Sequence, residues 1–117
     1  MSETQTNRVA VVQASPLFFD REGSVEKVCR LTREAGGEGA RLVLFPEAYV
    51  GGYPWGLGFG TVVGGRSDAG RRTWQRYWET AIDVPGSEVS RMGEAAKEAG
   101  VYLAVGVVER DSTFSRG

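Results

Sequence analysis

Two residue types that enzymes often use for acid-base and nucleophilic chemistry, histidine and cysteine, are scarce in this chain. Its 117 residues contain no histidine, and Cys29 is the single cysteine. The lack of histidine excludes Ser-His-Asp and Cys-His catalysis, and it argues against zinc or non-haem iron sites, which depend on imidazole ligands. We therefore expect acid-base work from carboxylates, amines, phenols or the backbone, with no metal and no cofactor.

Glu47 is the carboxylate whose position favours chemistry. It stands two residues past Phe45, which ends an apolar run that predicts a strand. Ligands of open α/β sheets collect beyond the carboxyl ends of the strands, where a carboxylate can act as a general base. The following Gly51-Gly52-Tyr53-Pro54 predicts an aromatic loop that folds over Glu47 and partly desolvates it. Position alone leaves open that Glu47 is a solvated turn residue without a catalytic role.

The other reactive side chains favour structural roles. Cys29 falls on the predicted inward face of a helix, where a buried cysteine behaves as a small hydrophobic residue. Lys27 lies two residues away on that helix and points elsewhere, and Lys97 lies in the exposed half of a later helix. We interpret both lysines as solvated charges. A single cysteine also excludes an internal disulfide and favours a reducing compartment.

The elements that position these side chains alternate between strands and helices. Continuous apolar runs predict strands at Val9 to Val12, Leu42 to Phe45 and Val101 to Glu109. Apolar residues at offsets of three and four predict a helix from about Glu22 to Ala35, with Asp20 or Ser24 as its cap. Two more helices are predicted at Asp68 to Thr80, with Trp74, Tyr77 and Trp78 on one side, and from Pro85-Gly86-Ser87 to a stop at Gly100. This order predicts an α/β domain whose helices cover one face of a mostly parallel or mixed sheet.

The segment from Pro46 to Gly65 is rich in glycine and aromatic residues. Loops of this length in a compact domain are functional or disordered, and the aromatic content argues against disorder. We therefore expect a functional loop next to Glu47.

Composition indicates an ordinary globular protein. The apolar share is 41%, the charged share is 25% and the net charge is −1, so no feature favours nucleic acid or an anionic membrane as a partner. No apolar run approaches the roughly 20 residues that a membrane span needs, and we expect a cytoplasmic location. Residues 1–7 are expected to form a flexible N-terminus ahead of one unit at residues 8–117.

Four segments together resemble the nitrilase superfamily of carbon-nitrogen hydrolases. The residues from Gly39 to Pro54 resemble its glutamate signature, and Val9 to Ala14 its opening strand. Arg76 to Glu79 with Val84 to Gly86 resembles the segment before its second helix, and Val105 to Asp111 its third strand and exit. Gly51-Gly52-Tyr53-Pro54, followed by the glycine-rich stretch that begins at Trp55, is most similar to the nitrilase branch.

The resemblance implies a fold and a reaction. The family fold is an α-β-β-α sandwich that assembles into homo-oligomers. Residues 8–117 would form its truncated N-terminal part, with one βαβ-αβ layer pair and no second sheet. The implied reaction converts a small nitrile and two waters into a carboxylic acid and ammonia, through a glutamate base, a lysine and a cysteine nucleophile. Glu47 matches the glutamate as general base and proton acceptor, whereas the family's lysine and cysteine lie further along than these residues reach.

Two roles remain open for the neighbouring aromatic residues and for the chain. Tyr53 and Trp55 are substrate-pocket candidates by position only, and they are equally compatible with the interior of a loop. The chain alone is expected to be inactive, as the product of a truncated gene, a fragmentary record or a split chain. It is also expected to expose a contiguous apolar surface and an unpaired strand edge. The alternative is a non-catalytic binding or assembly module that pairs with nitrilase subunits.

Overall fold

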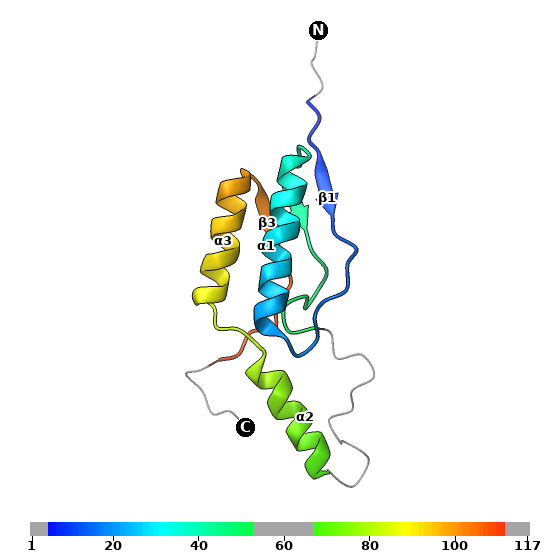
Figure 1. Ribbon diagram of the computed structural model, residues 1–117, viewed down its shortest axis with the longest axis vertical. Coiled ribbons are helices and arrows are strands. Elements are labelled where there is room, and N and C mark those ends of the chain that lie inside the picture. The colour runs from blue at the N-terminus through cyan, green and yellow to red at the C-terminus, as the bar shows by residue number, and fades with distance from the viewer. Residues whose placement is uncertain (1–4, 53–66, 112–117) are drawn as a thin grey trace.

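The computed structural model of the chain describes residues 5–52 and 67–111. Strands β1 (Val9–Val11), β2 (Leu42–Leu44) and β3 (Tyr102–Ala104) form one parallel sheet in the order β1-β2-β3. The helices are α1 (Arg21–Gly37), α2 (Asp68–Glu79) and α3 (Ser87–Ala99). Helices α1 and α3 lie side by side over one face of the sheet, and α2 projects from the lower end of that pair (Figure 1). The predicted α/β class with helices on one face is confirmed.

The register brings the carboxyl ends of all three strands to one edge. Val9 pairs with Leu42, and Leu42 pairs with Tyr102. The third strand was predicted to run from Val101 to Glu109, but only its first part, β3, pairs continuously with β2. Two single parallel bridges follow it along the chain. These parallel bridges join Val50 to Val107 and Ile82 to Glu109. Val50 and Ile82 belong to two different connecting segments. The residues after β3 therefore do not form one continuous strand with a single partner.

The helix boundaries follow local signals. The Asp20 carboxylate accepts a hydrogen bond from the Gly23 amide at 2.8 Å, which makes Asp20 the N-cap of α1. Ser24, the other candidate cap, instead donates its hydroxyl to the Leu17 carbonyl at 2.9 Å. Gly100 follows α3 as predicted. None of the helices in residues 5–52 and 67–111 is long and apolar enough to cross a membrane.

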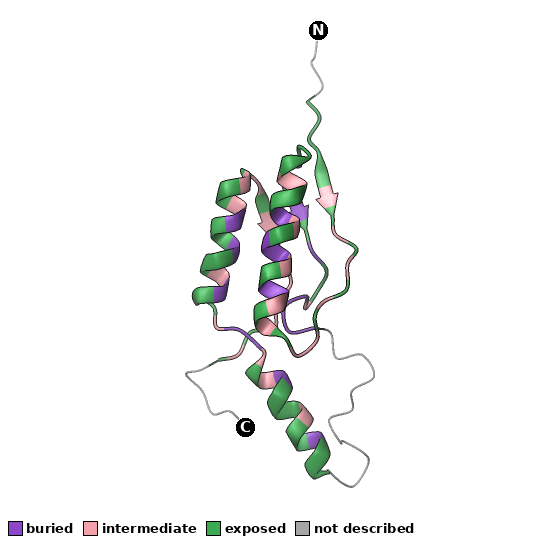
Figure 2. Ribbon diagram, in the orientation of Figure 1, coloured by how far each residue is buried: buried purple, intermediate pink, exposed green. Residues whose placement is uncertain are grey.

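The core lies between the helix pair and the inner face of the sheet (Figure 2). Val43 at the centre of β2 is fully buried, and Met92 and Ala95 of α3 pack in the same cluster. Helix α1 contributes Val25, Val28, Cys29 and Thr32, which are buried, and Ala35, which is partly buried against the core. Burial of this face therefore fixes the sheet against the helices.

The opposite face of the sheet is open to solvent. Its side chains are apolar and exposed, with Val11 64% and Tyr102 77% accessible, and the same face carries Val9, Leu42 and Leu44. The two long helices cover only one side of the sheet, which leaves these apolar side chains uncovered. The expected apolar surface is confirmed. Within the described residues the outer edges of β1 and β3 also pair with no further strand.

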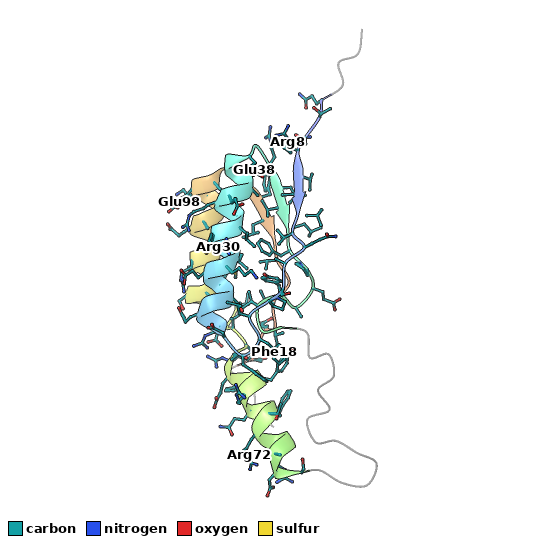
Figure 3. The ribbon with its side chains drawn as sticks, turned by 45° about the vertical axis from the view of Figure 1, so that its right-hand side comes forward. Arg8, Phe18, Arg30, Glu38, Arg72 and Glu98 are labelled. Atoms are coloured by element: carbon teal, nitrogen blue, oxygen red, sulfur yellow. The ribbon has the colours of Figure 1, made fainter. Side chains whose placement is uncertain are left out.

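Helix α2 is held to the rest of the molecule through aromatic contacts at its carboxyl end. Tyr77 is buried and donates its hydroxyl to the Gly52 carbonyl at 2.8 Å. Phe18 lies beside this end of the helix, and its ring centroid is 6.0 Å from that of Tyr77 (Figure 3). The Trp74 ring centroid lies 6.5 Å from that of Tyr77, so these two aromatic residues share one side of α2 as expected, although Trp74 is exposed and Trp78 is half-buried.

Candidate active site

Glu47 lies in a turn at the carboxyl edge of the sheet, where the sequence placed it. Phe45 extends the pairing of β2 by one residue, because its amide donates to the Ala104 carbonyl at 2.8 Å. The chain then turns and returns to the segment after β3, where the Val50 amide donates to the Gly106 carbonyl at 3.1 Å. The turn that carries Glu47 is therefore attached to the β3 segment on both sides.

Tyr49 anchors this turn in the core. Its side chain is only 1% exposed, and its ring centroid lies 5.1 Å from that of Phe45. The Tyr49 hydroxyl donates to the Ser15 carbonyl at 2.9 Å, which ties the turn to the segment after β1. Burial raises the pKa of Tyr49, partly opposed by the charge of Arg30. The phenol therefore stays protonated, as a hydrogen-bond donor must be.

Lys27 reaches the same carbonyl group. Its ammonium donates to the Ser15 carbonyl at 2.6 Å, and the residue is half-buried. The Lys27 side chain thus runs back to the segment after β1, and its hydrogen bond there is exposed to solvent, which is compatible with a solvated charge. Lys97 is exposed in the last turn of α3, as expected.

The Glu47 side chain is exposed. The loop that we expected to cover Glu47 continues into Tyr53 and Pro54, which lie outside the described residues, so its effect on Glu47 stays a prediction. Within residues 5–52 and 67–111, no hydrogen bond or ion pair engages this carboxylate. A carboxylate held on a fixed turn with free lone pairs is chemically suited to accept a proton.

Cys29 has the surroundings of a core residue. It is 6% exposed, and its thiol lies 3.6 Å from the Arg91 carbonyl, to which it donates across the contact between α1 and α3. Burial raises the pKa of the Cys29 thiol, and the charges of Arg33 and Arg91 only partly oppose this effect. A buried, protonated thiol is a poor nucleophile. The structural interpretation of Cys29 therefore agrees with its environment.

The other predicted features fall outside what the structure describes. Tyr53 and Trp55, the substrate-pocket candidates, lie outside the described residues, as does most of the glycine-rich loop. In the part of the chain that is described, no group of three or more cysteine, aspartate or glutamate side chains could hold a metal ion.

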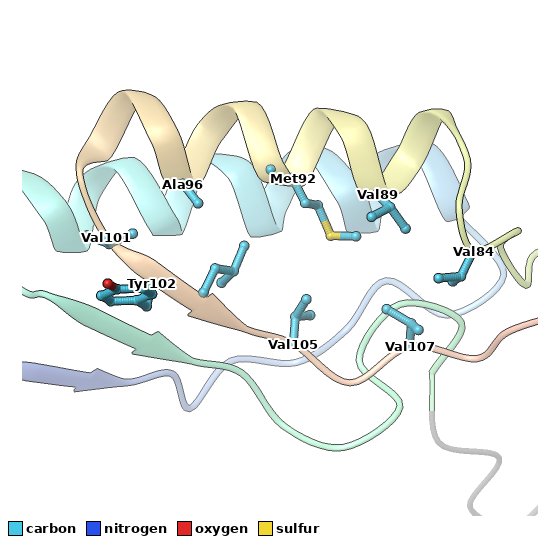
Figure 4. Close-up of a pocket in the computed structure, with 10 residues that line it drawn as sticks. Val84, Val89, Met92, Ala96, Val101, Tyr102, Val105 and Val107 are labelled. Atoms are coloured by element: carbon cyan, nitrogen blue, oxygen red, sulfur yellow. The ribbon is translucent and has the colours of Figure 1, made fainter.

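A groove of about 380 Å³ lies between α3 and β3 rather than at Glu47 (Figure 4). Its lining is almost wholly apolar and includes Val89, Met92, Val101, Leu103 and Val105. No carboxylate, amine or thiol lines this groove, and the phenol of Tyr102 is the one ionisable side chain in its lining. It is therefore not part of the candidate active site.

The comparison with protein families decides the relationship. The carbon-nitrogen hydrolase family matches residues 8–116. The chain belongs to this family. The match covers nearly the whole chain, so the fold described above is a part of the nitrilase-superfamily fold.

Individual relatives agree with the family match. The chain is 48% identical over 110 residues to a bifunctional nitrilase/nitrile hydratase of Nicotiana tabacum, covering 94% of this chain and 32% of that protein. It is 49% identical over 104 residues to an aliphatic nitrilase of Sinorhizobium fredii, covering 89% of this chain and 34% of that protein. Nitrilase 3 of Arabidopsis thaliana is 43% identical over 108 residues, covering 92% of this chain and 31% of that protein. The carbon-nitrogen hydrolase chain thus spans about one third of the length of these curated relatives.

Proposed function

We propose that this chain supplies the general base of a nitrilase-type active site, and that the base is Glu47. The reaction adds two waters to a small nitrile, R–CN, and yields the carboxylic acid R–COOH and ammonia. A cysteine thiolate and a lysine complete the site, and both come from residues beyond these 117. Tyr53 and Trp55 shape the pocket for the R group.

Each group has a distinct task in this reaction. The glutamate takes the proton of the cysteine thiol, so that the thiolate can attack the nitrile carbon, and then takes a proton from water. The lysine ammonium stabilises the negative charge that develops in the tetrahedral intermediates. An exposed Glu47 carboxylate on a fixed turn is available for both proton transfers once the remaining groups surround it.

One observation carries the proposal. Glu47 stands at the carboxyl edge of a parallel sheet, in a chain that is 48% identical to a bifunctional nitrilase/nitrile hydratase and 49% identical to an aliphatic nitrilase. Ligands of parallel sheets collect at that edge. A further part of the proposal, which rests on the family relationship alone, is that the full-length protein is a homo-oligomer in the cytoplasm.

The test uses the full-length gene product and aliphatic and aromatic nitriles. We expect ammonia release from the unmodified protein, and a fall in kcat of at least about a hundredfold in Glu47→Gln, the usual scale for loss of a positioned general base. The matched control is Glu94→Gln, which changes an exposed glutamate on α3 and should leave kcat unchanged.

Two results would contradict the proposal. A Glu47→Gln variant with unchanged kcat would show that another group is the base. A folded full-length protein that releases no ammonia from any nitrile would favour the alternative of a binding or assembly module.

A further inference from the structure

The backbone of Glu47 rests directly on Gly106, in the segment after β3. A Cβ atom placed on Gly106 would lie 2.6 Å from the Pro46 carbonyl oxygen and 2.7 Å from the Glu47 Cα, and it would also overlap the Ala48 amide nitrogen. Real Cβ atoms essentially never approach other heavy atoms within 3.0 Å. All three groups belong to the backbone, so none can move aside by rotating a side chain.

The residue after Glu47 shows that this turn is held under strain. Ala48 has a φ of 49°, in the left-handed region that costs a non-glycine residue about 1 kcal/mol or more. Its carbonyl accepts the Gly52 amide at 2.9 Å, and Val50 is bonded to Gly106 on the far side. Such a conformation persists only where the surrounding contacts determine it. The strain therefore indicates that the position of this turn is fixed by its neighbours.

We infer that Gly106 and Ala48 are positioning residues for Glu47. Gly106, by lacking a side chain, lets the Glu47 turn approach the segment after β3, and the left-handed Ala48 holds the carboxylate at that place. The effect on catalysis rests on the proposed nitrilase-type function, whereas the effect on the place of Glu47 does not. Sequence reasoning did not single out Gly106, although a glycine inside an apolar strand run is a known mark of close backbone approach.

Gly106→Ala in the full-length gene product is the direct test. An ordinary van der Waals contact for the new methyl group is 3.4–4 Å, so the Glu47 Cα must move by roughly 1 Å, a misplacement that can cost about a hundredfold in rate. We expect kcat to fall about 10- to 100-fold while KM changes by less than about threefold, since the base acts on the chemical step. The matched control is Gly93→Ala on α3, where an added Cβ meets no atom within 4 Å. This control should keep kcat and KM.

A second variant covers the case in which Gly106→Ala does not fold. Ala48→Gly relieves the left-handed strain but gives the unfolded chain more freedom, and these two effects nearly cancel in stability. We expect an unchanged melting temperature together with a fall in kcat of about threefold to tenfold, because the turn becomes looser. If Ala48 had only a structural role, a change that leaves the melting temperature unchanged would also leave kcat unchanged.

Crystal structures of the variants separate this inference from the proposed function. The Glu47 Cα should be displaced in Gly106→Ala and unmoved in Gly93→Ala. If the unmodified protein hydrolyses no nitrile, the proposed function fails and these structures alone decide the positioning. An active Gly106→Ala with unchanged kcat, an unmoved Glu47 Cα in that variant, or an Ala48→Gly variant with unchanged kcat would each overturn the inference.

Discussion

At the scale of single residues, the candidate site joins an exposed side chain to a rigid backbone. The Glu47 carboxylate is open to solvent, yet the chain on either side of it is fixed through Tyr49 and Gly106. A general base must be held within hydrogen-bond reach of the proton that it accepts. The turn supplies this placement before any substrate binds.

Cys29 permits a test of which residues serve structure and which serve chemistry. Cys29→Ala removes a buried sulfur between α1 and α3, and we expect the free energy of unfolding to fall by about 1–2 kcal/mol with kcat unchanged. Thermal unfolding and nitrile hydrolysis of the full-length protein provide the measurements. Loss of activity in Cys29→Ala at an unchanged melting temperature would mean that the thiol takes part in the chemistry.

The same thiol gives a prediction for alkaline pH. Burial raises the pKa of Cys29, so the folded protein holds the thiol proton more tightly than the unfolded chain. Its contribution to stability is complete below the unfolded pKa of about 8.5, and it is lost as pH rises through the higher folded value. The melting temperature of the unmodified protein should therefore fall more steeply above about pH 8.5 than that of Cys29→Ala. Parallel pH curves for the two proteins would refute this assignment.

At the scale of elements, the helix boundaries are decided locally and the strands are not. Asp20 and Gly100 mark the ends of α1 and α3 because their signals act on neighbouring residues, and sequence reasoning placed these ends within about two residues. The segment from Val101 to Glu109 reads as one strand but pairs with β2, Val50 and Ile82 in turn. The exposure of Glu47 is not decided locally either, because it depends on which distant segments cover the turn.

The cap of α1 gives a prediction at this scale. Asp20→Ala removes the acceptor for the Gly23 amide and should lower the free energy of unfolding by about 1 kcal/mol. Asp20→Asn keeps an acceptor at the same place and should retain nearly all of that stability. Chemical denaturation of the full-length protein measures both. An equal loss in the two variants would show that the charge, rather than the hydrogen bond, stabilises the helix start.

At the scale of the whole molecule, the three strands present two different faces. Leu44 and its exposed neighbours are apolar yet open to solvent, whereas Val43 beside it is fully buried under the helices. Soluble monomers rarely expose contiguous apolar patches of more than a few hundred Å². The 117-residue chain by itself is therefore expected to self-associate through the open face.

Paired substitutions on β2 test this expectation. Leu44→Lys, on the open face, should shift the isolated chain toward a monomer in size-exclusion chromatography with light scattering, and it should reduce binding of dyes to apolar surface. Val43→Lys, one residue away on the covered face, should instead unfold the chain because it buries an unpaired charge. A sharp monomer peak for the unmodified chain, without dye binding, would sink the prediction.

The isolated chain should also release no ammonia from nitriles. It holds the proposed base, but its one thiol is buried and protonated, so the covalent route has no nucleophile. The assay that detects activity in the full-length protein provides the measurement. Turnover above background that disappears in Cys29→Ala would assign the thiol a catalytic role after all.

The order of the parallel sheet also has a consequence for synthesis on the ribosome. The central strand β2 pairs with β1, made before it, and with β3, made roughly 60 residues after it. At about 5–20 residues per second, β2 therefore waits about 3 to 12 s for its second partner. Helix α1 is synthesised between β1 and β2, so it is the first long helix that can shelter Val43 during that interval. The nascent βαβ unit is thus the first part to gain protection, and its uncovered side is the surface that a nascent-chain chaperone would meet.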